Sequence, residues 1–261
     1  MSTIRLGGMA LANGVLVHGP TAWACAIRTE SGEIKIASAR KRLLAPRIQQ
    51  PFVRGPLRLA ESFAMIPELR RKLPEARLPF ERPAVLTATI ASALSVQALR
   101  RSNRLGAVAR ELVSGVLALA PAVFALRGGE LAAYHGAEHV SIGTYEHGEK
   151  RAKEHERCGS HLIGPLLVAS AAGNLLAARA PARLRGPARA AGSLGAVGTA
   201  VEVFGWMTRH PGHPFAKALA FPGHELQHRI ATAEPSPEQL EVAEAALAAC
   251  LELEHGDRAA H

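Results

Sequence analysis

Uncharged, mainly apolar stretches alternate with basic loops along the middle of the chain. Four of them are rich in Ala, Leu and Gly: residues 83–99, 112–126, 162–178 and 190–208, the last interrupted only by Glu202. A membrane-spanning helix needs about 20 apolar residues, with about 17 as the lower limit, and small residues let such helices pack closely. The pattern predicts about four marginal membrane helices, and a buried soluble helical bundle is the alternative interpretation.

The first 38 residues show the patterns of short strands rather than helices. Strands are expected at 9–17 and 23–28 and, after the turn Glu30-Ser31-Gly32, at 33–36. Residues 40–82 are basic and punctuated by prolines, with helices expected near 56–63 and 67–73. This organisation predicts a small N-terminal β-containing lobe with a basic connector over residues 1–82.

The end of the chain carries clear signals for one more helix. Ser236-Pro237-Glu238-Gln239 offers a capping Ser, a Pro at the first helical position and a Gln that can close a capping box. Residues at helical spacing follow before Gly256, which gives an amphipathic helix that is expected to dock on the rest of the protein: Leu240, Ala243, Leu247, Cys250 and Glu254. We therefore predict a mainly α protein with a helical membrane domain over 83–233 and a C-terminal helix over 234–261.

Composition narrows the class of protein. Hydrophobic residues make up 48% of the chain and aromatic residues only 4%, which excludes a mainly disordered chain and disfavours a β-sandwich. The net charge of +9 suits acidic lipid headgroups or nucleic acid, but no nucleic-acid-binding motif accompanies it, so membrane lipid is the expected partner. Three widely spaced cysteines indicate a reducing compartment, and residues 1–10 carry no pattern of a removable signal peptide.

A helix expected over residues 130–146 carries the best candidate for a metal site. Its sequence His135-Gly136-Ala137-Glu138-His139 places two imidazoles one turn apart, as tetrahedral zinc requires, with Glu138 beside them as a base for water. The pattern HxxEH is that of the inverzincins. A closed network of hydrogen bonds between the His and Glu side chains is the alternative, since buried imidazole and carboxylate groups need partners.

Several residues could supply the third ligand. The candidates are Glu146, Glu149, His155, Cys158 and Glu202, of which His155 and Glu202 are favoured. A Glu within membrane-like sequence is expensive to bury and is therefore expected to be functional, whereas Cys158 can equally be a small buried hydrophobe.

A second segment competes for the metal. His224-Glu225-Leu226-Gln227-His228 is an HExxH, the pattern of zincin proteases, with two His ligands and a Glu base. Pro222 and Gly223 stand directly before it, so both ligands would lie in the first turns of a short helix. His210 and His213 add to a loose cluster that can bind metal adventitiously.

Short segments distributed over almost the whole chain carry a resemblance to a known family. They are Gly7-Gly8, Gly14-Val15-Leu16, Gly19-Pro20, Pro51-Phe52-Val53-Arg54-Gly55, Glu61-Ser62, Tyr134-His135-Gly136-Ala137-Glu138-His139, Glu146, Gly148-Glu149, Arg157-Cys158-Gly159, Pro222-Gly223, Glu234-Pro235 and Gln239-Leu240-Glu241-Val242-Ala243. Together they resemble the YqhQ-like family, a group of uncharacterised bacterial integral membrane proteins that are described as metal-dependent enzymes. The segment from Tyr134 to His139 is the most specific part of this resemblance.

The resemblance implies one site made of Tyr134, His135, Glu138, His139, Glu149, His155, Arg157 and Cys158, with Glu202 at an acidic position in the last membrane helix. It also implies a bacterial cytoplasmic membrane with the N-terminal lobe in the cytoplasm. The chain departs from the family pattern at Asn13, His18 and Glu156. The HExxH at His224 is not part of that pattern.

These observations lead to one expectation with two alternatives. The first is a zinc-dependent membrane hydrolase in which His135, His139 and one of Glu149, His155 or Glu202 hold the metal and Glu138 activates water, acting on a small-molecule or lipid-linked substrate. The second is a non-enzymatic assembly or transport component with a structural metal or a His–Glu network. The third is a soluble zincin-type protease that uses His224, Glu225 and His228.

Overall fold

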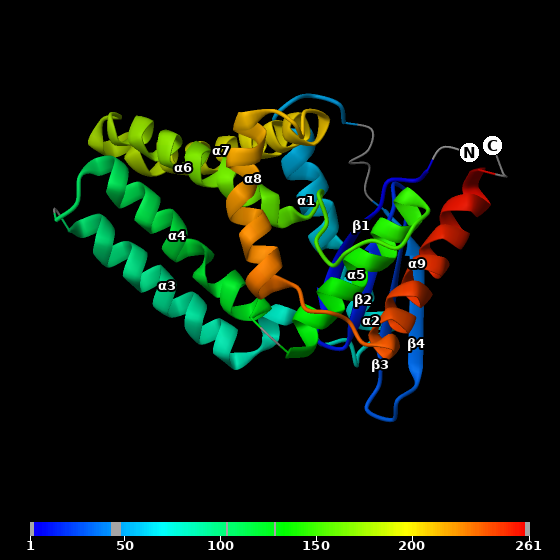
Figure 1. Cartoon of the computed structure of the whole chain (residues 1–261). Coiled ribbons are helices and arrows are strands. Elements are labelled where there is room, and N and C mark those ends of the chain that lie inside the picture. The colour runs from blue at the N-terminus through cyan, green and yellow to red at the C-terminus, as the bar shows by residue number, and fades with distance from the viewer. Residues whose placement is uncertain (1–2, 43–47, 103, 128, 259–261) are drawn as a thin grey trace.

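The computed structural model describes residues 3–42, 48–102, 104–127 and 129–258. Residues 43–47 of the predicted basic connector lie outside them. Figure 1 shows a small sheet with helices on both sides at one end of the molecule and a group of long helices at the other. The prediction of a mainly helical chain with a small N-terminal sheet is confirmed.

The sheet has four antiparallel strands in sequence order, β1 (Gly7–Leu11), β2 (Gly14–His18), β3 (Ala22–Arg28) and β4 (Ile34–Arg40). The prediction of one strand over 9–17 was wrong, because a two-residue turn splits this segment between Leu11 and Gly14. The Asn13 side chain stabilises the turn by donating to the carbonyls of Arg28 and Glu75. Such a side chain offers the backbone an alternative to a continuous strand.

Helices cover both faces of the sheet. Alternate strand residues Val15, Val17, Ala24 and Ala26 pack against α5 (Gly129–His147) and α9 (Pro237–Arg258). On the opposite face, Leu16, Trp23, Cys25 and Ile27 pack against α2 (Ile66–Lys72). Because side chains alternate between the two faces of a sheet, both faces bury apolar side chains. One of these faces holds α5 against β1.

The C-terminal helix docks on the sheet as predicted. The Gln239 amide nitrogen donates to Ser236 Oγ while the Ser236 amide donates to Gln239 Oε1, so the expected capping box forms. Val242, Ala243 and Cys250 are buried against the sheet. The helix runs past Gly256 to Arg258.

The second part of the molecule consists of long helices. α3 (Pro83–Arg101) and α4 (Ala107–Leu126) form one antiparallel pair, and α6 (Ile163–Ala178) and α7 (Arg185–Arg209) form another (Figure 1). α4 contacts α6, and α8 (Pro214–Leu226) packs against α6 and α7. Short helical turns connect them: η2 (Pro79–Glu81), η3 (Gly159–Leu162), η4 (Ala182–Leu184) and the π-helix η5 (Gln227–Ala231). α1 (Arg54–Ala64) lies against α7.

Two of the four predicted membrane segments meet the requirements for crossing a membrane in the described part of the chain. They are α4 and the continuous helix Gly159–Ala178, each 20 residues long. The prediction of four was wrong, although all four segments are helices. α3 contains Thr87, Thr89, Ser92, Ser95 and Gln97, and α7 contains Arg185, Arg189 and Glu202, so both helices are too polar.

The apolar surfaces of these helices are not covered by the rest of the chain. Only 6% of the apolar window of α4 and 28% of that of Gly159–Ala178 are buried. Large side chains with at least half of their area exposed line several of the helices: Leu86, Ile90, Leu94, Val108, Val116, Val168, Leu176, Leu194, Phe215 and Phe221. The core helices of a soluble bundle would be mostly buried, so this part of the molecule exposes an extensive apolar surface.

Candidate metal site

Helix α5 places the HxxEH residues between the sheet and the other helices. His135, Glu138 and His139 are 9%, 7% and 2% exposed, respectively. Gly136 makes this burial possible, because the chain that follows η5 crosses α5 at this position. A Cβ atom on Gly136 would lie 2.1 Å from the carbonyl oxygen of Ala233. Glycine, although unfavourable within a helix, thus lets this segment approach His135, Glu138 and His139.

Backbone carbonyls orient both histidines. His135 Nδ1 lies 2.8 Å from the Ala231 oxygen and His139 Nδ1 lies 2.6 Å from the Lys153 oxygen. A carbonyl can only accept, so each Nδ1 carries the proton and each Nε2 keeps a free lone pair. Metal-bound histidines in proteins are held in this way, with the second ring nitrogen donating to a carbonyl or carboxylate.

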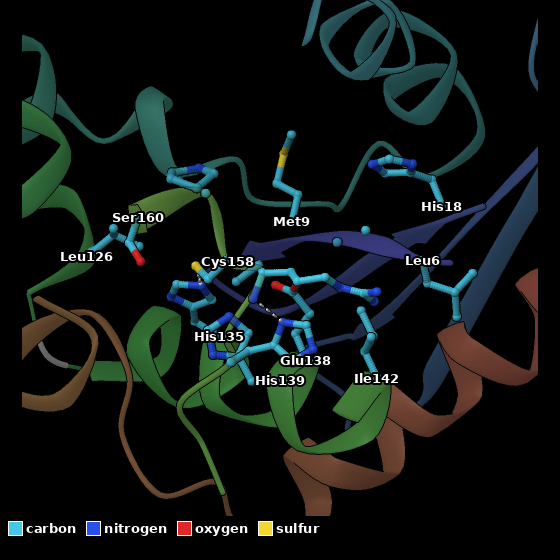
Figure 2. A pocket seen from close by; sticks show the side chains of 17 residues that line it. Leu6, Met9, His18, Leu126, His135, Glu138, His139, Ile142, Cys158 and Ser160 are labelled. Atoms are coloured by element: carbon cyan, nitrogen blue, oxygen red, sulfur yellow. Dashed lines mark hydrogen bonds between the residues drawn. The ribbon is translucent and has the colours of Figure 1, made fainter. Parts of the chain in front are cut away.

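Cys158 completes the group from the N-terminal end of η3. One ligand atom each from His135, His139 and Cys158 lies within 4.8 Å of the others, and the distance from His135 Nε2 to Cys158 Sγ is 3.6 Å. Two ligands at zinc–nitrogen and zinc–sulfur bond lengths, separated by a tetrahedral angle, would be about 3.6 Å apart. Figure 2 shows these three side chains converging beside Glu138.

Burial raises the pKa of the Cys158 thiol, and Ser160 opposes this effect by hydrogen bonding. Burial, aided by the neighbouring His135, holds the pKa of His139 well below its usual value. His139 is therefore neutral, which is the form that binds metals. Cys158 would have to lose its proton on binding.

Glu138 lies beside the three potential ligands and faces Gly8 of β1. A Cβ atom on Gly8 would lie 2.4 Å from Glu138 Oε1, so this strand residue must be very small. No other described residue forms a hydrogen bond with the Glu138 carboxylate. Burial, with a smaller contribution from Cys158, raises the pKa of Glu138 to about 7 even though His135 acts in the opposite direction. The carboxylate can thus exchange a proton near neutral pH.

The segment that carries Cys158 is fixed by a polar network. Glu146 of α5 forms an ion pair with Arg157 and accepts from His155 Nε2 at 3.3 Å. His155 Nδ1 in turn accepts the Arg157 backbone N–H at 3.4 Å. Both ring nitrogens of His155 are therefore engaged, and this histidine positions the cysteine rather than offering a lone pair to a metal.

Gln227 is a further residue of the site that the sequence did not single out. It is fully buried, and its side chain accepts from the His155 amide at 2.8 Å and donates to Ser160 Oγ at 2.7 Å. These contacts join both sides of Cys158 to η5. The residue stands inside the HExxH pattern, where the π-helix turns it inward. Its neighbours in the sequence, Glu225, His228 and Arg229, are polar as well, so no sequence signal distinguished Gln227.

A cavity of about 430 Å³ lies in front of the site. Its walls come from β1, α5 and the segment 155–160, and Leu126 at the end of α4 also contributes. His135, Glu138, His139, His155, Arg157 and Cys158 all line it (Figure 2). The chemical groups of the site therefore face a space large enough for part of a substrate.

The structure places three of the predicted site residues elsewhere. Glu149 lies at the surface beyond α5, 3.3 Å from Arg151. Glu202 on α7 accepts from Arg54 Nε at 2.8 Å and from the Phe52 amide. Tyr134 belongs to the apolar core between α5 and the sheet and does not line the cavity. Glu202 thus has an ionic partner that the apolar sequence around it did not reveal.

The residues of the HExxH pattern have other partners. His228 Nδ1 lies 2.9 Å from Glu154 Oε1, and Glu225 forms an ion pair with Arg229. The His224 and His228 rings are 6.2 Å apart. Among the described residues, His135, His139 and Cys158 form the one group of three or more potential ligands close enough to share an ion.

The chemistry of this donor set fits zinc. Two imidazole nitrogens and a thiolate suit zinc, whereas magnesium and calcium prefer oxygen ligands. His135, His139 and Cys158 would hold the ion, and three protein ligands leave one position open, as in catalytic zinc sites.

Comparison with known proteins gives one match, to a family model that covers the region of this site. No curated protein matches the chain. No solved structure matches it. Residues 129–253 match the model of a family described as "Protein of unknown function (DUF1385)", and this region contains α5, Cys158, Gln227 and most of α9.

Proposed function

We propose that this chain is a membrane-associated, zinc-dependent hydrolase whose site is formed by His135, His139, Cys158 and Glu138. One observation carries the proposal. Three oriented potential ligands and an ionisable carboxylate without a hydrogen-bond partner among the described residues face one cavity. A purely structural zinc site commonly has four protein ligands, whereas a catalytic site has three and an open position.

The roles of the residues follow from their surroundings. When bound, zinc would supply Lewis-acid polarisation of the substrate or of water. Glu138 would accept a proton from the attacking water, because its carboxylate lines the cavity beside the three potential ligands and has no hydrogen-bond partner among the described residues. Arg157 and His155 keep Cys158 in place through Glu146.

Membrane association is supported by the two long apolar helices and their exposed side chains. The C-terminal end of α4 at Leu126 and the N-terminal end of the helix Gly159–Ala178 both line the cavity. The site therefore lies at the same level as the ends of both helices, where the headgroup region of a bilayer would be. A bacterial cytoplasmic membrane, with the sheet on the cytoplasmic side, is the location that we propose.

Elemental mass spectrometry on detergent-purified protein tests the metal site. Wild type is expected to hold close to one zinc per chain, the double variant His135→Ala, His139→Ala close to none, and the matched variant His224→Ala, His228→Ala as much as wild type. If zinc is lost only in the His224→Ala, His228→Ala variant, the zincin alternative replaces this proposal. If the variant Glu138→Gln retains zinc and still hydrolyses an ester probe at the full rate, Glu138 is not the catalytic base.

A further inference from the structure

One edge of the sheet is open beside the site. β1 is an edge strand, and in its ladder the closing pair Leu11–Gly14 of a two-residue turn exchanges hydrogen bonds. Met9 and Gly7 therefore also point their backbone groups at β2, because these groups alternate along a strand. Gly8 and Ala10 point theirs away from the sheet, and they have no hydrogen-bond partner among the described residues.

The register of the next strands supports this assignment. The Arg28 amide donates to the Asn13 oxygen, so the residues of β2 that bond to β3 are Val15 and Val17. Gly14, Leu16 and His18 are left to bond to β1. The outward direction of Gly8 and Ala10 thus follows from two independent ladders.

The cavity extends along this open edge. Met9 of β1 and His18 of β2 lie on one face of the sheet, and Glu138 faces Gly8 on the other face, yet all of them line the same cavity. A space that touches residues on both faces of a strand must pass its edge. Figure 2 shows β1 running through the middle of the lining residues, with Met9 and His18 on one side and His135 and Glu138 on the other.

The same edge already accepts an extended chain at its far end. The Ala12 amide, which also points outward, donates to the Arg77 oxygen at 2.9 Å. Two residues further along this segment, Pro79 lines the cavity. Gly8 and Ala10, the next two outward positions, have no such partner among the described residues, and both line the cavity beside Glu138. Gly8 is exposed, whereas Ala10 is 7% exposed.

We propose that the substrate is an extended polypeptide segment that adds to the free edge of β1 by hydrogen bonding to the backbone of Gly8 and Ala10. This inference rests on the proposed hydrolase function and names its substrate class. Strand addition supplies affinity through main-chain hydrogen bonds and needs little sequence specificity. Because Gly8 contacts Glu138, a peptide bond held at this position lies next to the general base.

The reaction is peptide-bond hydrolysis, in which all atoms are accounted for. The water oxygen forms a bond to the carbonyl carbon and the C–N bond breaks. Glu138 accepts one proton from the water and passes it to the leaving nitrogen, so that a carboxylic acid and an amine result. The acid then transfers its remaining proton to the amine, which gives a carboxylate and an ammonium group.

Full-length protein in detergent, loaded with zinc, should be incubated with a proteome-derived peptide library and, separately, with 4-nitrophenyl acetate. A peptide that is cleaved is then resynthesised with one N-methyl group at each position in turn. Pairing with β1 predicts that N-methylation at alternate residues around the cleaved bond lowers kcat/KM at least about tenfold, because it removes N–H groups that point at the strand. N-methylation at the intervening residues should have little effect.

Two proline variants give an independent test on the protein. Ala10→Pro removes an outward N–H group at the cavity and should lower kcat/KM for the peptide at least about tenfold with zinc content retained. Ile36→Pro removes an outward N–H group on β4, at the opposite edge of the sheet, and should leave it unchanged.

The outcomes separate the two proposals. Glu138-dependent ester hydrolysis without cleavage of any peptide would overturn the inference and leave the hydrolase function standing. If N-methylation at adjacent residues of the peptide lowers kcat/KM equally, with no alternation, the inference is also overturned and the hydrolase function still stands. A zinc-loaded protein that hydrolyses neither probe would contradict the proposed function itself.

Discussion

The chain contains two five-residue segments with the same potential ligands, and the structure surrounds them very differently. On α5, the His135 and His139 rings are 4.3 Å apart, buried, and anchored through Nδ1 to backbone carbonyls. At the end of α8, the His224 and His228 rings are 6.2 Å apart, and the His228 side chain is 61% exposed and bonded to Glu154.

The difference shows that histidine spacing alone does not make a site. Both segments place two imidazoles at i and i+4 with a Glu nearby. Among the described residues, only the α5 segment has both of its rings held through Nδ1 by a backbone carbonyl and a thiol within reach. The segment on α8 contributes in another way, because the π-helix turns Gln227 inward to hold the Cys158 loop.

The largest expected effect is a difference in the rate of hydrolysis between variants of Glu138 and Glu225. Glu138→Gln should lower hydrolysis by about 10²- to 10⁴-fold, because it removes the general base, with zinc content unchanged. Glu225→Gln, the matched change in the α8 segment, should leave the rate as it is, because Glu225 pairs only with Arg229 among the described residues. Rates on the ester probe measure both. Equal losses in the two variants would remove the distinction between the segments.

Burial of histidines around the cavity predicts acid sensitivity. Burial, reinforced by Lys41, which is itself paired with Glu61, lowers the pKa of His18 from 6.5 to about 4. The unfolded chain therefore binds a proton below pH 6.5 that the folded chain does not. Stability is full above that pH and falls as the pH drops towards 4, by about 3 kcal/mol.

Unfolding of the metal-free protein in detergent, followed by circular dichroism between pH 7.5 and 4, measures this loss. His18→Gln should make the dependence on pH shallower. An unchanged pH dependence in this variant would show that His18 does not carry the effect.

A close contact between Gly136 and the backbone of Ala233 is a further difference between the α5 segment and the α8 segment. Gly136→Ala should weaken zinc binding by about 10- to 100-fold, because the new Cβ displaces Ala233 and with it the Ala231 carbonyl that orients His135. Gly205→Ala is the matched control, since a Cβ on this helical glycine meets nothing within 4 Å. Competition with a chromogenic chelator gives both affinities. Equal affinity in the two variants would contradict the role of the Ala231 carbonyl.

The smallest expected effect concerns Gln227. Gln227→Ala leaves the His155 amide and the Ser160 hydroxyl without their buried partner and should lower the free energy of unfolding by about 1–3 kcal/mol. His228→Ala, one position further along the same segment, should change it much less, because its side chain is mostly exposed. Denaturant unfolding compares the two. A larger loss of stability in His228→Ala than in Gln227→Ala would show that the α8 segment contributes through its histidine rather than through Gln227.

Local patterns in the sequence predicted a large part of this architecture. The α5 helix, the capping box at Ser236 and the four helical segments follow from periodicity and capping residues over short distances. The split of the first strand at Asn13 was missed, although Asn13-Gly14 is itself a local turn signal. The contacts of Asn13 with Arg28 and Glu75, which support this turn, come from more distant parts of the chain.

The candidate site could also be predicted from the sequence only where its residues are close together in the chain. The spacing of His135, Glu138 and His139 within one helix could be predicted, whereas the third potential ligand depends on how a loop returns to that helix. Sequence reasoning favoured His155 and Glu202, but Glu146 and Arg54 engage them, and Cys158 reaches the histidines. Side chains with ionic partners in distant segments cannot be distinguished from free ligands before the fold is known.

Zinc K-edge X-ray absorption on the detergent-purified protein tests the central claim most directly. We expect one sulfur and two imidazole nitrogens around the metal in wild type, and loss of the sulfur shell in Cys158→Ser with the imidazole signals retained. A wild-type spectrum without sulfur, or a sulfur shell that survives in Cys158→Ser, would contradict the assignment of His135, His139 and Cys158 as the metal site.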